Sequence, residues 1–344
     1  MPRVRALVNA LRRLCVVSVA ATLLAACEHA QPFGGADLGP NVPFSQDFPR
    51  RLTFNPPGDI APAWLPDGSG IIYSYQRLDR ADHDRCLGIL PAEGGHIGRS
   101  ICHRLPLDAD STNTLWEPSV GPGSLLAYVR ESSGLRAPAP QSRELVVAAL
   151  DDPEPGRVVR SFPYTAPGGS LHEYAAYLHW VDDHTLVYLA EHVAYTFPPL
   201  GYDTLYTPIE IAQLTLSADS VVVSVVPGTL GATSVTVDTA GAICYTRSGD
   251  SRVYRIARGG SAAAVLFDFG GLGSARDVQV RSNTLVAVVG GALYRVDLAA
   301  SAAVPIPASG PLGPARPALS PSGARVVAES RRFGAADLWL LQVP

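Results

Sequence analysis

Residues 61–73 (APAWLPDGSGIIY) carry the pattern that decides the fold: a short strand, a tight Asp-Gly turn and a second apolar strand. Asp-Gly between two apolar runs is a strong hairpin signal, because glycine adopts the positive φ that such turns require. The pattern returns near the end of the chain at residues 316–327 (RPALSPSGARVV). The sequence therefore predicts a fold built from repeated β-hairpins.

Four further copies lie between these two, with the Pro-Asp-Gly core lost. They are residues 116–129, 179–190, 235–246 and 278–289. Each copy is followed by another strand, and helical periodicity is almost absent, so the fold class is all-β. Six copies leave about 49 residues for each in residues 50–344. Seven blades of about 42 residues would also fit that length, but only six inner hairpins are present.

The first and last copies resemble the propeller repeats of TolB-like proteins, which share a Pro-x-Trp-Ser-Pro-Asp-Gly core. The resemblance spans residues 50–344 and rests on periodicity in the four middle copies. It implies a six-bladed β-propeller of four-stranded antiparallel blades. It says little about activity, because propellers host many unrelated functions.

The two ends of the repeat region predict how the ring closes. The last copy supplies only three strands, which would leave an open edge, and open edges promote aggregation. The segment 50–54 (RRLTF) stands before the first copy and has no other sheet to join. We expect it to provide the fourth strand of the last blade.

The N-terminal segment predicts export and a lipid anchor. Four arginines precede an apolar run, residues 14–26, that is too short to span a membrane, which is typical of a signal peptide. The run ends Leu-Ala-Ala before Cys27 and resembles the lipobox of bacterial lipoproteins. This resemblance implies removal of residues 1–26 and acylation of Cys27, and Glu28 favours the outer membrane, facing the periplasm or the cell surface. The alternative is an ordinary signal peptide or a short buried helix, with Cys27 incidental.

Residues 27–49 are rich in proline, glycine and polar residues, and we interpret them as a flexible tether before a propeller at 50–344. All four basic residues of the signal peptide are lost on processing, while all 31 acidic residues remain. The resulting acidic chain argues against nucleic acid as a partner.

Export permits disulfides. Cys86 and Cys102 stand symmetrically about Gly94-Gly95 in a predicted hairpin, so we expect them to be joined across adjacent strands. Cys244 falls in a column of core positions and is interpreted as a small buried side chain.

Loops after the second strand of each hairpin are long in the first three blades and short in the last three. We expect this loop-rich face to hold a partner, because loops on a rigid scaffold usually carry contacts. The third loop offers an aromatic contact surface of Tyr195, Phe197, Tyr202 and Tyr206, unless these rings fold back over their own blade.

Aligning the second strands places several polar residues at one height near the channel mouth. They are Gln76, Arg130, Glu191 and Arg247, with His192 and Glu329 beside them. This set either binds an anionic or sugar-like ligand or forms ion pairs between blades.

No catalytic signature is present: the chain has no Gly-x-Ser-x-Gly elbow and no phosphate-binding glycine loop, and its histidine spacings match no zinc signature. No cofactor or metal is expected. The sequence favours a non-catalytic, lipid-anchored scaffold that binds an envelope protein. The alternatives are a propeller enzyme of lyase or hydrolase type with a polar site at the channel mouth, and a glycan-binding propeller.

Overall fold

The predicted hairpins form antiparallel sheets in the computed structural model. It describes residues 47–55, 58–76, 85–103, 111–134, 142–163, 170–196, 203–206 and 209–344, all within the unit Ala36–Pro344. Apart from three short 3-10 turns, the regular elements of these residues are strands. The turns are η1 (Pro122–Ser124), η2 (Gly270–Leu272) and η3 (Gly310–Leu312). No helix in the described ranges is long and apolar enough to cross a membrane.

The largest sheet has eight strands and consists of two antiparallel halves. The first half contains β2 (Asp59–Trp64), β3 (Gly70–Gln76), β4 (Arg85–Pro91) and β5 (Arg99–Ile101). The second contains β6 (Ser111–Val120), β7 (Leu125–Gly134), β8 (Ser142–Ala149) and β9 (Arg157–Pro163). The halves are linked by a single parallel residue pair, Arg85 with Thr114. Each half has the strand order of one blade.

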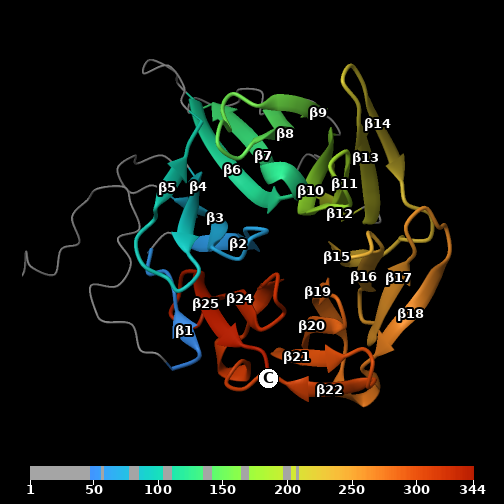
Figure 1. Cartoon of the computed structure of the whole chain (residues 1–344). Helices are drawn as coiled ribbons and strands as arrows, with labels where there is room; N and C mark the ends of the chain where they lie inside the picture. The colour runs from blue at the N-terminus through green and yellow to red at the C-terminus, as the bar shows by residue number, and fades with distance from the viewer. Residues whose placement is uncertain are drawn as a thin grey trace, which may run out of the picture. The chain divides into compact units, whose positions relative to one another are not determined.

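The remaining sheets each correspond to one later copy of the repeat. The third blade contains β10 (Ser170–Trp180), β11 (Thr185–Thr196), β13 (Glu210–Leu216) and β14 (Val221–Val225), with β12 (Asp203–Tyr206) paired to β11. The fourth contains β15 (Ala232–Val237), β16 (Ile243–Arg247), β17 (Arg252–Ile256) and β18 (Ala263–Asp268). The fifth contains β19 (Ala275–Arg281), β20 (Thr284–Val289), β21 (Ala292–Asp297) and β22 (Ala302–Pro305). The blades form a β-propeller with the first strand of each nearest the centre (Figure 1).

The last blade contains strands from both ends of the described chain. Its sheet order is β1 (Arg50–Arg51), β25 (Asp337–Gln342), β24 (Arg325–Ser330) and β23 (Ala315–Leu319). Arg50 lies opposite Leu340, and the blue and red strands are adjacent in Figure 1. The predicted closure of the last blade by an N-terminal strand is confirmed, although the regular pairing is shorter than the predicted segment 50–54.

The core lies between neighbouring blades. Second strands contribute its largest fully buried side chains, among them Tyr73, Tyr128, Tyr188 and Tyr245. Cys244 is fully buried in an apolar cluster, as predicted. Cys86 and Cys102 form the predicted disulfide, so the register of the first blade is confirmed.

Candidate functional site

A β-bulge recurs in every innermost strand and shapes the centre of the propeller. The register shifts between Ile60 and Ala63 in β2, and at the equivalent point of the other five strands. In five of the six, the bulged residue has φ between 48° and 54°; these residues are Ala61, Glu117, Tyr177, Asp277 and Arg316. A bulge re-aims the side chain it carries. Four polar side chains are thereby placed at one level of the central channel.

These four side chains pair across the channel. Arg316 from the last blade forms an ion pair with Glu117 from the second. The Tyr177 hydroxyl of the third blade donates a hydrogen bond to Asp277 of the fifth, and the Tyr177 backbone N–H donates to Glu117 Oε2 at 2.9 Å. The guanidinium of Arg316 lies 4.7 Å from the centre of the Tyr177 ring, which favours a cation–π contact. The Arg316–Glu117 ion pair and the Tyr177–Asp277 hydrogen bond thus cross the channel at the level of the bulges.

Glu329 lies beside this network in β24. It is 7% exposed, and its Oε1 accepts a hydrogen bond from the Ala61 backbone N–H at 2.6 Å. Burial raises the pKa of Glu329 to about 7, with Glu117 and Asp277 adding to the shift and Arg316 opposing it. The network therefore joins three carboxyl groups to the guanidinium of Arg316, and Arg276 lies 3.7 Å from Asp277.

A cavity of about 80 Å³ extends from the bulge residues toward the turn end of the innermost strands. Its wall has an apolar sector that includes Trp64, Val120 and Leu319. Its polar sector includes His179, Gln279 and Arg281. A cavity in which a few polar groups converge is the usual form of a small-molecule site.

The charge state of the polar sector follows from burial. Burial, reinforced by the positive charge of Arg281, lowers the pKa of His179 to about 3, so this imidazole is neutral at physiological pH. Burial also lowers the pKa of Arg281, which stays charged because arginine titrates far above neutrality. The sector thus presents one cation and neutral groups that can donate hydrogen bonds.

The fold is shared with solved propellers at low similarity. The chain resembles oligogalacturonate lyase from Vibrio parahaemolyticus, with 11% identity, a TM-score of 0.45, and coverage of 89% of this chain and 98% of that one. It resembles a putative TolB from Agrobacterium tumefaciens, with 13% identity, a TM-score of 0.45, and coverage of 84% and 92%. It also resembles the Cps50 (Swd1) β-propeller domain of Myceliophteria thermophila, with 10% identity, a TM-score of 0.47, and coverage of 83% and 97%.

No protein-family model matches the chain, and no curated protein matches it by sequence. At these identities and TM-scores the solved structures carry no argument about activity.

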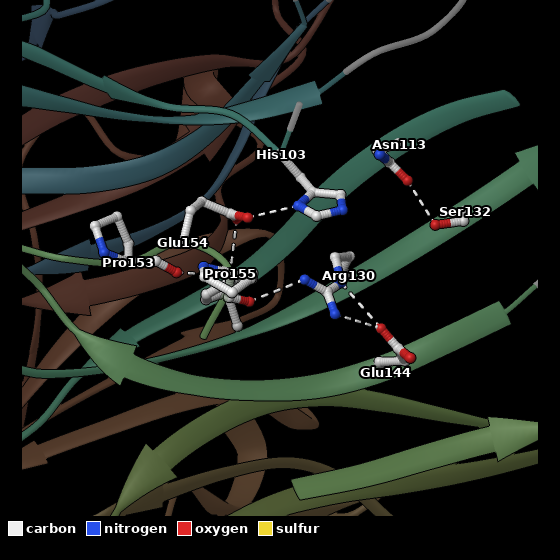
Figure 2. Close-up of polar contacts among 9 residues, drawn as sticks. His103, Asn113, Arg130, Ser132, Glu144, Pro153, Glu154 and Pro155 are labelled. Carbon is white, nitrogen blue, oxygen red and sulfur yellow. Dashed lines mark hydrogen bonds and ion pairs between the residues drawn. The ribbon is translucent and has the colours of Figure 1, made fainter. Parts of the chain in front are cut away.

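The residues predicted to share one height near the channel mouth do not contact one another where their side chains are described. Arg130 is bound within its own blade, where its Nε and Nη2 donate to Glu144 Oε2 at 2.9 and 2.7 Å (Figure 2). Its Nη1 donates to the Pro155 carbonyl at 3.0 Å. The second strand lies between the first and third strands of its blade, so its side chains reach β8 and the loop after it. The Arg130 ion pair joins strands of one blade rather than two blades.

The other described members of this set have separate surroundings. Arg247 donates to the Gly228 carbonyl at 2.7 Å and packs 4.5 Å from the centre of the Tyr254 ring. The carbonyl of Gln76 accepts a hydrogen bond from Asn55 at 2.9 Å. Glu329 alone belongs to the central network. A binding role for these residues stays a prediction.

The structure does not describe the side chains of several predicted residues. Cys27, Phe197 and Tyr202 lie outside the described residues. For four more the backbone is described and the side chain is not; they are Glu191, His192, Tyr195 and Tyr206. Tyr195 and Tyr206 lie in the antiparallel pair β11–β12, whereas Glu191 and His192 of β11 lie opposite Tyr174 and Glu173 of β10.

A second polar cluster lies near Arg130. His103 Nδ1 lies 2.5 Å from Glu154 Oε2, and the Tyr128 hydroxyl donates to Glu154 Oε1 at 3.0 Å (Figure 2). Burial opposes ionisation of Glu154, but these two partners, together with Arg130, hold its pKa below its usual range. The cluster joins the end of the first blade to the loop after β8, a structural role.

In the described ranges, one group of side chains has the spacing of metal ligands: Asp182, Asp183 and His184. Asp183 and His184 are exposed, and Asp182 already pairs with Arg258. The group lies in the β10–β11 turn, where Asp182 also accepts the His184 backbone N–H at 2.9 Å. Turn formation accounts for these residues.

Proposed function

We propose that this propeller is a non-catalytic binding protein that takes a small polar ligand into the turn end of its central channel. The observation that supports this is the cavity lined by Arg281, Gln279 and His179, which converge on one space from two different blades. Ligand sites in rigid folds take this form, with a few placed polar groups fixing the orientation of the ligand.

The surrounding chemistry supports binding better than catalysis. A general acid or base needs a pKa near the operating pH and a partner that orients it. His179 has a pKa of about 3, and no carboxylate contacts it within the described residues. Burial, followed by the charge of Asp277, raises the pKa of Tyr177, so its hydroxyl stays protonated. Glu329, whose pKa is about 7, is not among the residues that line the cavity.

The proposal includes the cellular setting expected from the sequence. Six blades form the ring, residues 1–26 are removed on export, and Cys27 carries the lipid. The tether at residues 27–49 then holds the propeller at the outer membrane, facing the periplasm or the cell surface. The envelope would supply both the ligand and any partner.

A second candidate function, contact with an envelope protein, is favoured by the strand lengths of two blades. β6 and β7 have 10 residues each, and β10 and β11 have 11 and 12, whereas β15 and β16 have 6 and 5. Because the hairpin turns define the opposite face, the extra length lies on the loop-rich face. This raised sector, with the β11–β12 pair, is the surface we propose for a protein partner.

The channel proposal is tested by narrowing the cavity. Ala63 lines it, and Ala63→Leu adds volume there without removing a polar group. Small polar compounds are screened against the wild type by thermal shift and calorimetry. A ligand of the channel loses affinity in Ala63→Leu and keeps it in Ala264→Leu, a control on the exposed outer strand β18. Equal affinity in both variants would place the ligand elsewhere and refute the proposal.

The anchor is tested separately. Cys27→Ala should abolish labelling by a fatty-acid analogue and release the protein from the membrane fraction. Normal fractionation of this variant would contradict lipidation at Cys27.

A further inference from the structure

We propose that the ligand of the central channel is a small oxyanion, bound by the guanidinium of Arg281 with Gln279 and His179 as neutral donors. This inference rests on the proposed function, because it assigns a ligand class to the same cavity.

The setting of Arg281 carries the argument. In β19, Val278 and Val280 are buried, while Gln279 and Arg281 alternate with them and line the channel. Within the part of the chain that the structure describes, the Arg281 side chain is half-buried and has no ion pair and no hydrogen bond. A guanidinium that is partly removed from water and has no partner is stabilised by an anion in the cavity.

The neighbours of Arg281 suit an anion. The Oε1 atom of Gln279 accepts a hydrogen bond from the Thr236 hydroxyl at 3.5 Å, which leaves the amide hydrogens of Gln279 for another acceptor. Neutral His179 can donate one N–H. Two carboxylates also line the cavity, but Glu117 pairs with Arg316, and Asp277 accepts the hydrogen bond of Tyr177.

The carboxylate of Asp277 lies far from the guanidinium of Arg281 along the cavity wall. Asp277 lies four residues before Arg281 in the same strand, which corresponds to roughly 10–13 Å at the rise of a bulged strand. At such a separation in a partly hydrated site, the carboxylate only weakly opposes an anion at Arg281.

The cavity volume limits the size of the ligand. A volume of about 80 Å³ suits a small ligand. Inorganic phosphate and short carboxylates have this size and share the planar or tetrahedral oxygens that a guanidinium binds through two N–H groups.

The test is calorimetric titration of the mature, detergent-solubilised protein with inorganic phosphate, with acetate and with glycerol as a neutral probe. We expect at least one of the two anions to bind. The anion that binds more tightly shows whether the ligand is a phosphate or a carboxylate. Arg281→Gln should weaken it about tenfold or more, and Arg281→Lys, which keeps the charge, should weaken it less. Arg295→Gln is the matched control, because Arg295 pairs with Asp297 and does not line the cavity.

Three results would overturn the inference. One is unchanged anion affinity in Arg281→Gln, with folding verified by circular dichroism. Another is a loss of anion affinity in Arg295→Gln equal to that in Arg281→Gln. The third is no binding of either anion at millimolar concentrations. Binding of glycerol alone, sensitive to Ala63→Leu, would reject the anion and leave the proposed channel function standing.

Discussion

At the scale of single residues, the centre of the propeller brings three carboxyl groups together. Glu117 has Arg316 as a direct partner, and Asp277 has the Tyr177 hydroxyl. Glu329 accepts a hydrogen bond from the Ala61 backbone N–H and interacts with Arg316, but burial outweighs both effects. A buried carboxyl group keeps its proton to a higher pH. The protonation of Glu329 therefore links folding to pH in the physiological range.

Glu329→Gln should remove a pH dependence of stability. The folded pKa of about 7 lies above the ordinary 4.5, so the folded state holds the proton more tightly than the unfolded state. The resulting stabilisation is complete below about pH 4.5 and is lost as the pH rises through 7. Glutamine stays neutral and keeps an acceptor for Ala61. Relative to the wild type, the variant should gain up to about 3 kcal/mol between pH 5 and pH 8.

Urea unfolding at both pH values measures this difference. Asp219→Asn, at an exposed carboxylate without an ion pair among the described residues, serves as the control and should follow the wild type at both pH values. A constant difference between Glu329→Gln and the wild type from pH 5 to pH 8 would show that Glu329 ionises normally.

The sequence predicted the polar residues near the channel mouth and did not predict the polar bulge residues at the centre. Single residues show why. Gln76, Arg130 and Arg247 lie on second strands, and none of them lines the cavity. The central residues occupy a bulge, and a bulge changes which side chains face inward without leaving a periodic signal. One local clue existed: Glu117 and Arg316 stand immediately before the proline of their repeats.

At the scale of the element, neighbouring blades are joined by a recurring tryptophan contact. Trp64 Nε1 donates to the Ala318 carbonyl of the preceding blade at 2.8 Å, and Trp180 Nε1 donates to the Ser119 carbonyl at 3.2 Å. Both tryptophans end an innermost strand, and both are buried. The repeat motif thus contains the contact between blades as well as the hairpin.

Gly121 is required by this contact. A Cβ at Gly121 would lie 2.4 Å from Cγ of Trp180, far inside van der Waals distance. Gly121→Ala should therefore displace the indole and destabilise the protein by about 1–3 kcal/mol, as overpacked cores do. Thermal unfolding measures the effect. Gly271→Ala is the control, since a Cβ there meets nothing within 4 Å, and it should change stability by less than about 0.5 kcal/mol. Similar losses in both variants would contradict the steric explanation.

Elements were the level at which the sequence was most informative. Turn chemistry and alternating apolar residues located the hairpins, and the spacing of Cys86 and Cys102 located their disulfide. The extra strand β12 was not predicted, because its sequence, DTLY, is short and lies within a loop rich in aromatic residues and proline. Its pairing depends on the length of β11.

At the scale of the whole molecule, the ring is held together where its two ends meet. Beyond the paired residues of β1, the Leu52 N–H donates to the Leu338 carbonyl at 2.7 Å. The Leu338 N–H donates to the Thr53 hydroxyl at 2.9 Å. Leu52 is fully buried, and Arg51 lies 2.7 Å from the buried carboxylate of Asp337. A closed propeller supports each blade from both sides, so loss of this seam weakens the neighbouring blades as well.

Deleting residues 28–54 should therefore unfold the protein far more readily than deleting 28–45. The longer deletion removes the burial of Leu52, worth about 2–3 kcal/mol, and the two hydrogen bonds that Leu52 and Thr53 make with the Leu338 backbone. It also takes Arg51 away from Asp337 and exposes β25 as an edge strand, which invites aggregation. The shorter deletion removes a polar segment without a periodic apolar face and should be nearly silent. Both truncations are expressed without lipid and compared by thermal unfolding and light scattering. Equal melting temperatures would mean that the seam at β1 does not stabilise the ring.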